Sequence, residues 1–258
     1  MIDTSGIYTF LLILVRMTSF FVTSPIFSSK TIPSSYKIGL AFFISLVLYP
    51  TLDLDLMLTL DGEFMFLIIQ EAILGMSIGF MAQLIFYSIQ VAGSFVDLQI
   101  GFSLANVIDP QTGAQSPIMG NFKYVFAVLL FFSLNIHHLL IEAIISSYEI
   151  LPLTGDWLNQ LSNDQVIVFI VSLFSKMFLI AFKMSAPLVV TLLLTDIALG
   201  ILARTVPQLN VFVVGMPLKI VITFFLLLLL AAVFIDNFRD LFYEMINSMK
   251  EFMELMRL

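Results

Sequence analysis

The sequence predicts an all-α membrane protein, and three properties of the chain support this. Hydrophobic residues make up 60% of its 258 residues, charged residues make up only 11%, and the mean hydropathy is +1.07. A water-soluble domain of this length contains far fewer apolar residues. The apolar residues are also collected in long segments, which is typical of helices that lie in a bilayer.

Apolar segments follow one another along most of the chain. They cover residues 7–27, 38–49, 64–96, 124–145, 165–203 and 211–235. A straight spanning helix needs about 20 apolar residues, which the first, fourth and sixth segments provide, whereas Pro50 ends the second early. The third and fifth are too long for one perpendicular span, so each is strongly tilted or broken. Pro187 is the expected break in the fifth.

The last section, residues 236–258, predicts an amphipathic helix. Its apolar residues recur at spacings of three and four, and charged residues fill much of the rest. The recurring apolar positions are Phe238, Leu241, Phe242, Met245, Met249, Phe252, Met253 and Met256. Such a helix packs its apolar face on its own protein, or offers that face to a partner or to the membrane surface. The sequence leaves these alternatives open.

The topology also has two solutions. Lys30 and Lys37 lie in the first loop, whereas acidic residues fill the loops after residues 50 and 146. Six simple spans would place these basic residues inside and both termini outside. A hairpin at Pro187 would bring the C-terminus inside instead.

Several classes of function are disfavoured by the composition. The chain has no cysteine, and its two histidines, His137 and His138, are adjacent and point to different sides of a helix, so no metal or cofactor site is expected. The net charge of −7 disfavours nucleic acid. No hydrolase, metalloprotease or P-loop motif is present, so no catalytic residue is expected. The N-terminus lacks a basic region and a cleavage site, and is expected to begin the first mature helix.

Residues 97–123 form a long irregular break between two apolar segments. Between Asp97 and Lys123 the only charge is Asp109. Glycine and proline forbid one continuous helix here, at Gly101, Pro110, Gly113, Pro117 and Gly120. The break also holds apolar residues that a solvated linker would not contain, namely Phe102, Leu104, Val107, Ile108, Ile118 and Met119. Such a segment is expected to pack inside a protein cavity, since irregular backbone at membrane depth needs protein or water around it.

Ionisable residues within the apolar segments are candidate functional residues, because they are costly there. They are Arg16, Glu71, Lys176, Lys183 and Asp196. One hypothesis is an ion or proton pathway; the other, which we favour, is a set of pairs between helices or subunits. Single acids and bases scattered over different segments suit such pairs better than a relay. In the third segment, Gly75 and Gly79 form a small-residue surface that allows close helix approach.

A second break and its surroundings carry a family resemblance. Residues 200–219 read GILARTVPQLNVFVVGMPLK, in which Arg204, Pro207, Gln208 and Asn210 separate two apolar runs and Gly215 and Pro217 are expected to delay the next helix. This stretch, preceded by Pro187 and Asp196, resembles the FliR family, called SctT in injectisomes. Glu71 with Gly75 and Gly79, and the stretch QVAGSFVDLQIGFSLANVIDPQTGAQSP, resemble further motifs of that family. The resemblance covers essentially the whole chain and is strongest to the flagellar branch.

The resemblance implies an architecture and partners that composition does not. The family forms a helical, cone-like export gate with FliP and FliQ in the bacterial inner membrane, at the flagellar basal body, and unfolded proteins pass through it. Its fold is one of bent helical hairpins, with a FliP-like part followed by a FliQ-like hairpin. FlhB associates with this complex, which favours a cytoplasmic C-terminus and a hairpin at Pro187. The expected sections of a single domain are 1–96, 97–123, 124–235 and 236–258.

The resemblance also implies that the central loop is a plug in the closed pore. Carried over to this chain, the plug comprises Phe102, Leu104, Asn106, Val107, Ile108, Asp109, Pro110, Gln111, Gly113 and Pro117. Apolar residues can seal a channel by excluding water. Low charge lets the segment rest in a dry constriction.

Two functions follow as hypotheses. The first is a non-enzymatic structural and gating subunit of a protein-export pore. The second is a secondary transporter or ion channel that uses Glu71, Lys176, Lys183 and Asp196. A transporter would be expected to show internal repeats with matching broken helices, and the sequence shows no convincing repeat.

Overall fold

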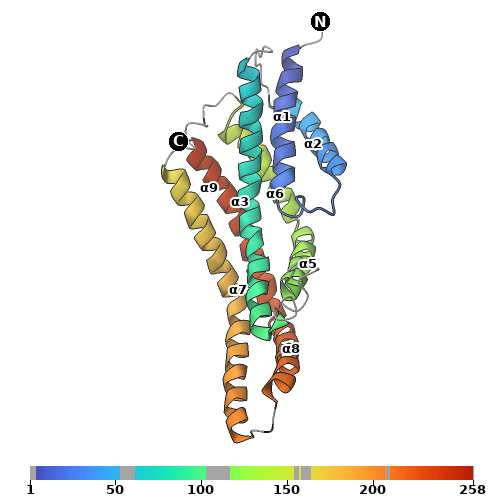
Figure 1. Cartoon of the computed structure of the whole chain (residues 1–258). Coiled ribbons are helices and arrows are strands. Elements are labelled where there is room, and N and C mark those ends of the chain that lie inside the picture. The colour runs from blue at the N-terminus through green and yellow to red at the C-terminus, as the bar shows by residue number, and fades with distance from the viewer. Residues whose placement is uncertain are drawn as a thin grey trace. The chain divides into compact units, whose positions relative to one another are not determined.

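The computed structural model describes residues 4–52, 62–102, 117–153, 157, 164–206, 208 and 210–257, and all the regular secondary structure within them is helical. The helices are α1 (Thr4–Thr23), α2 (Ser34–Leu48), the short 3₁₀ helix η1 (Tyr49–Thr51), α3 (Gly62–Ile100), α5 (Ile118–Ser133), α6 (Ile136–Ile150), α7 (Asp164–Thr205), α8 (Val211–Leu229) and α9 (Ala231–Arg257) (Figure 1). The expectation of an all-α membrane protein is confirmed.

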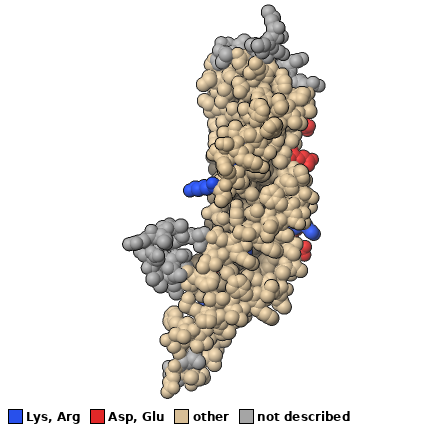
Figure 2. All heavy atoms as spheres, turned by 90° about the vertical axis from the view of Figure 1, so that its right-hand side faces the viewer, with Lys and Arg blue, Asp and Glu red and all other residues tan. Residues whose placement is uncertain are grey.

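Four of these helices, α1, α3, α7 and α8, are long and apolar enough to cross a membrane. The bent pair α5 and α6 could supply a fifth span. Large apolar side chains remain exposed along the long helices, and the face drawn in Figure 2 carries few charged groups. Such a surface suits lipid or other apolar helices better than water.

The chain divides into two compact units. Unit 1 comprises Met1–Phe86, Asn135–Phe174 and Tyr243–Leu258, and unit 2 comprises Tyr87–Leu134 and Ser175–Phe242. Three helices, α3, α7 and α9, therefore contribute to both units. Each unit gathers segments that are distant in the sequence, including parts of several of the predicted sections.

The expected hairpin at Pro187 is wrong. Helix α7 runs unbroken from Asp164 to Thr205 with Pro187 inside it, and the chain turns back only after Thr205, before α8 begins at Val211. The residues around Pro187 are apolar or small helix-compatible residues, so nothing beside the proline favours a turn. Apolar membrane helices also tolerate an isolated proline.

The start of the next helix was also placed too late. Gly215 and Pro217 lie inside α8, which begins at Val211. Asn210 makes this possible as the N-cap, because its side chain accepts hydrogen bonds from the Phe212 and Val213 amides at 3.2 and 3.4 Å. A proline in the second turn deprives the helix of only one backbone hydrogen bond.

The fourth apolar segment is not one helix. It is divided into α5 and α6 around Leu134 and Asn135, and Asn135 adopts the left-handed conformation with φ of 58°. Asparagine tolerates this region better than other residues with a Cβ. The segment stays apolar on average across this break, so its hydropathy did not predict the division into two helices.

The central break is shorter than predicted. Helix α3 continues through Asp97 to Ile100, and Gly101 ends it with φ of 100°. A glycine with positive φ is a common helix terminator because it has no Cβ to clash. Helix α5 then begins at Ile118.

The amphipathic C-terminal helix begins at Ala231, five residues earlier than predicted. All of the apolar positions named for it above are buried in the chain, whereas Asp240, Glu244, Lys250, Glu251 and Glu254 are not. Of the alternatives left open, packing on its own protein is the one observed.

Candidate functional site

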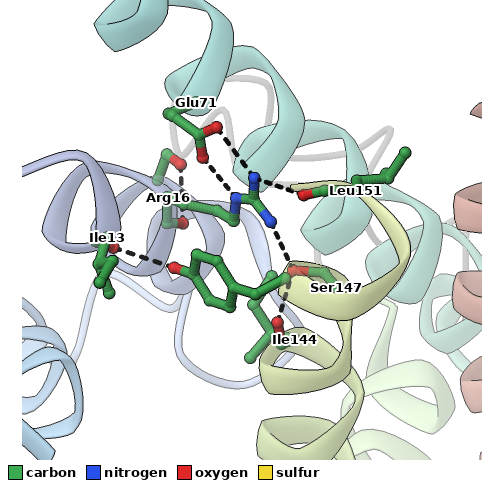
Figure 3. Close-up of polar contacts among 8 residues, drawn as sticks. Ile13, Arg16, Glu71, Ile144, Ser147 and Leu151 are labelled. Atoms are coloured by element: carbon green, nitrogen blue, oxygen red, sulfur yellow. Dashed lines mark hydrogen bonds and ion pairs between the residues drawn. The ribbon is translucent and has the colours of Figure 1, made fainter. Parts of the chain in front are cut away.

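The first polar cluster lies in unit 1 and is centred on the buried Arg16 of α1 (Figure 3). Its guanidinium forms a two-pronged ion pair with Glu71 of α3. Nε donates to one carboxylate oxygen, and Nη2 donates to the other at 2.9 Å. Both side chains are fully buried. Two residues proposed separately from the sequence as functional candidates are therefore partners.

Helix α6 and the residue after it complete this cluster. Nη1 of Arg16 donates to Ser147 Oγ at 3.1 Å, and Nη2 also donates to the carbonyl of Leu151 at 3.0 Å. The ring of Tyr148 lies 4.2 Å from the guanidinium carbon, and its hydroxyl donates to the carbonyl of Ile13 at 3.2 Å. A buried charge is tolerated when it is paired and its donors are satisfied. The cluster thus fixes α1, α3 and α6 in one register.

Close packing of α1 on α3 brings these charges together. A Cβ added at Gly75 would clash with the carbonyl oxygen of Arg16 and with Ser19, and one at Gly79 would clash with Phe20 and Thr23. Two glycines four residues apart lie on one face of a helix and let two backbones approach. Thr23 Oγ1 also donates to the carbonyl of Met76 at 3.1 Å across this contact.

The second cluster, in unit 2, holds the two ends of the central loop together. Both carboxylate oxygens of Asp97, near the end of α3, lie 3.1 Å from the amide of Met119 at the start of α5. Helix N-termini leave amides without internal partners, and their dipole favours an anion. Gly93 and Gly120 pack backbone to backbone beside this contact, where a Cβ on either would clash. The described residues on either side of the central loop are therefore held side by side within unit 2.

A third set of contacts ties the start of this loop to the α7–α8 hairpin. Lys219 of α8 forms an ion pair with Asp196 of α7, and its ammonium donates to the carbonyl of Gln99 at 3.0 Å. The Gln99 amide donates to Asp196 at 2.9 Å. A cavity of about 200 Å³ lies beside them, lined in part by Ile100, Gly101 and Gly215. These contacts fix the last turn of α3, from which the loop departs.

Most of the predicted plug lies outside the described residues. These residues are Leu104, Asn106, Val107, Ile108, Asp109, Pro110, Gln111 and Gly113. The two described members are Phe102 and Pro117, which are half-buried. Pro117 is the N-cap of α5.

Four other predicted residues lie outside these clusters. Lys176 is half-buried and Lys183 is exposed on α7. Arg204 and Gln208 are exposed near the turn between α7 and α8. Pro207 lies outside the described residues. Glu71 and Asp196, which a transporter would use together, belong to different units and are each paired within their own.

Sequence reasoning missed several polar partners. Lys219 was not singled out within residues 200–219, and Asp97 and Lys123 were named only as the limits of the first break. Ser147 and Tyr148 gave no indication in the sequence, because such residues are common in apolar helices. In the part of the chain that is described, no group of three or more His, Asp or Glu side chains is arranged to hold a metal ion.

Comparison with known proteins identifies the family. The profile of the family described as "Bacterial export proteins, family 1" matches residues 7–245. The chain is 44% identical to the flagellar biosynthetic protein FliR of Bacillus subtilis over 95% of both chains. It is 29% identical to FliR of Escherichia coli over 92% of this chain and 90% of the relative, and 30% identical to Yop proteins translocation protein T of Yersinia pestis over 86% and 85%. This chain therefore belongs to the FliR family of bacterial export proteins.

Proposed function

We propose that this chain is a structural and gating subunit of the flagellar type III protein export apparatus. With FliP and FliQ it would form the pore through which unfolded substrates cross the inner membrane, and FlhB would associate with that complex. Its relatives named for flagellar biosynthesis and for Yop translocation support an export role. Membership of an export-protein family supports it too.

One observation carries the gating role: the ends of the central loop are held side by side. The Asp97 carboxylate meets the Met119 amide, while Gln99 is fixed by Lys219 and Asp196. A segment with fixed ends and a weakly charged, partly apolar sequence can occupy a narrow pore without much desolvation. The glycines and prolines in its sequence would let it move without unwinding a helix. The loop would act as a plug that excludes water and ions from the closed pore.

The helical architecture supports a shared assembly. At 1.5 Å per residue, the 39 residues of α3 and the 42 residues of α7 extend over about 58 and 63 Å, roughly twice the thickness of the hydrocarbon core. Much of their exposed apolar surface then needs cover other than lipid. Helices α7 and α8 form the hairpin that would correspond to the FliQ-like part, and the preceding helices would form the FliP-like part.

The plug assignment is tested by ion leakage through the assembled complex. Residues 106–116 are replaced by a Gly/Ser segment of equal length, so that Pro117 and the anchored ends remain. The conductance of membranes containing the complex is then measured. We expect it to rise, because the apolar seal is lost while the pore wall is retained.

The control is Gly39→Ala, at a position where an added Cβ meets nothing within 4 Å. It should leave conductance at the wild-type level. The complexes that contain the loop variant and the Gly39→Ala variant are first compared with the wild-type complex on a native gel, to establish that all assemble equally. Equal conductance of the loop variant and the wild type would remove the plug assignment.

A further inference from the structure

Lys123 of α5 is a deeply buried cation. Only 3% of its surface is exposed, and no hydrogen bond to its ammonium group is found within the described part of the chain. The ring centre of Phe234 lies 5.2 Å from Nζ of Lys123. A cation–π contact compensates only part of the hydration that an ammonium loses on burial.

The charged groups nearby do not satisfy this ammonium. Asp97 interacts with Lys123 electrostatically. Its carboxylate, however, accepts hydrogen bonds from the amides of Met119 and Gly120 at the start of α5. Arg16 and Lys219 differ from Lys123 in this respect, because Arg16 donates hydrogen bonds to the Glu71 carboxylate and Lys219 forms an ion pair with Asp196.

Lys123 lies at an apolar cavity of about 190 Å³ in unit 2, between α5 and the junction of α8 and α9. The rest of its lining includes Phe122, Phe126, Phe224, Leu228, Phe234 and Phe238. Phe234 and Phe238 are buried, whereas Leu228 is 79% exposed and forms part of the rim. Among the described residues that line this cavity, Lys123 supplies the cationic group and the others are apolar.

We propose that this cavity receives a carboxylate side chain from an apolar helix of a neighbouring membrane subunit of the export complex. An aspartate or glutamate within such a helix would be costly alone and would be stabilised by the Lys123 ammonium, as intramembrane charges generally pair. The inference rests on the proposed function, because it requires that the chain works within a multi-subunit complex.

Size and donor chemistry favour a carboxylate over a lipid phosphate. An apolar cavity of about 150 Å³ accommodates a molecule the size of benzene, so the present one has room for a carboxylate side chain and one adjoining apolar group. A phosphate headgroup is larger and carries more acceptor oxygens than one ammonium can satisfy. The exposed apolar rim at Leu228 suits the apolar residues that would flank the carboxylate on its helix.

Lys123→Met tests the proposal through two effects of opposite sign. Methionine keeps the length and the apolar stem but removes the charge. For the full chain purified alone, the melting temperature should rise by a few degrees, because an unsatisfied buried charge is removed. When the chain is co-expressed with the other membrane subunits of the export apparatus, recovery of the complex should fall on the order of thirtyfold, because the partner carboxylate loses its counter-ion.

Two variants serve as controls in the same measurements. Lys30→Met removes an exposed lysine from the loop after α1 and should change neither quantity. Lys123→Arg retains the positive charge and should preserve most of the recovery. A fall in both the melting temperature and the recovery would indicate a purely structural lysine and would overturn the proposal. Unchanged recovery of the Lys123→Met complex would overturn it as well.

Photo-crosslinking identifies the occupant. A benzoyl-phenylalanine is introduced at Leu228, on the rim, and crosslinked peptides from the wild-type complex are sequenced. A peptide of another subunit with an Asp or Glu in an apolar segment supports the proposal. A crosslink to lipid alone or to a second copy of this chain overturns it. If no other export subunit is recovered with the co-expressed wild-type chain, the proposed function fails and the inference fails with it. If other subunits are recovered but none is crosslinked at Leu228, only the inference is contradicted.

Discussion

The guanidinium of Arg16 loses its hydration in unit 1, and Glu71, Ser147 and Leu151 replace most of it. A buried pair of this kind adds little net stability compared with well-packed apolar residues. Breaking it is different, because one charge then remains buried without a partner. The Arg16–Glu71 pair therefore contributes structural specificity rather than stability. Only one register of α1 against α3 satisfies both charged groups.

This argument predicts a strong coupling between the two residues. Arg16→Met should destabilise the chain by about 3–5 kcal/mol, because Glu71 is left unpaired. The double variant Arg16→Met/Glu71→Leu should recover most of that loss. Unfolding in mild detergent can be followed by the single tryptophan, Trp157, which is buried in unit 1. Arg204→Met, at an exposed arginine, is the control; additive effects of Arg16→Met and Glu71→Leu would contradict the argument.

At the scale of elements, the contact of α1 with α3 depends on the absence of two side chains. Gly75→Ala should destabilise the chain by about 1–3 kcal/mol, because the new Cβ meets the backbone of Arg16 as well as the side chain of Ser19. Gly39→Ala is the matched substitution in α2, where the Cβ would meet nothing. It should be neutral or stabilise by up to about 1 kcal/mol, because alanine favours helix more than glycine does. Equal effects of the two substitutions in the same unfolding measurement would refute the close-packing argument.

At the level of elements, the sequence predicted the features that follow from local composition and missed those that depend on contacts with distant residues or on backbone conformation. The apolar segments, the amphipathic terminal helix and the small-residue face at Gly75 and Gly79 all follow from local pattern. The pairing of Arg16 with Glu71 joins residues 55 positions apart, which no local pattern records. The break at Asn135 and the continuity of α7 through Pro187 depend on backbone conformations that hydropathy does not encode. Family resemblance supplied the proposed function, but it did not locate the hairpin turn.

At the scale of the whole molecule, the long helices expose more apolar surface than one bilayer can cover. Exposed positions Val171, Phe182, Leu194 and Ile201 extend over 30 residues of α7, about 45 Å of helix. Containing that length in a hydrocarbon core of about 30 Å would require a tilt of roughly 48°, beyond the usual range of 0–40°. Other subunits are the natural cover for the remainder.

The resulting prediction is that assembly withdraws part of α7 from lipid without exposing it to water. The chain has no native cysteine, so single cysteines at these four positions can carry spin labels without background. Oxygen partitions into lipid, so a label that faces lipid is accessible to it. On going from the isolated chain to the reconstituted complex, at least one label should lose its access to oxygen. The same label should also remain inaccessible to a water-soluble relaxation agent. Ser185→Cys, at a buried position, should be inaccessible to both agents in the isolated chain and in the complex. If all four labels kept full oxygen access in the complex, α7 would be a lipid-facing helix and the shared-assembly argument for its length would fail.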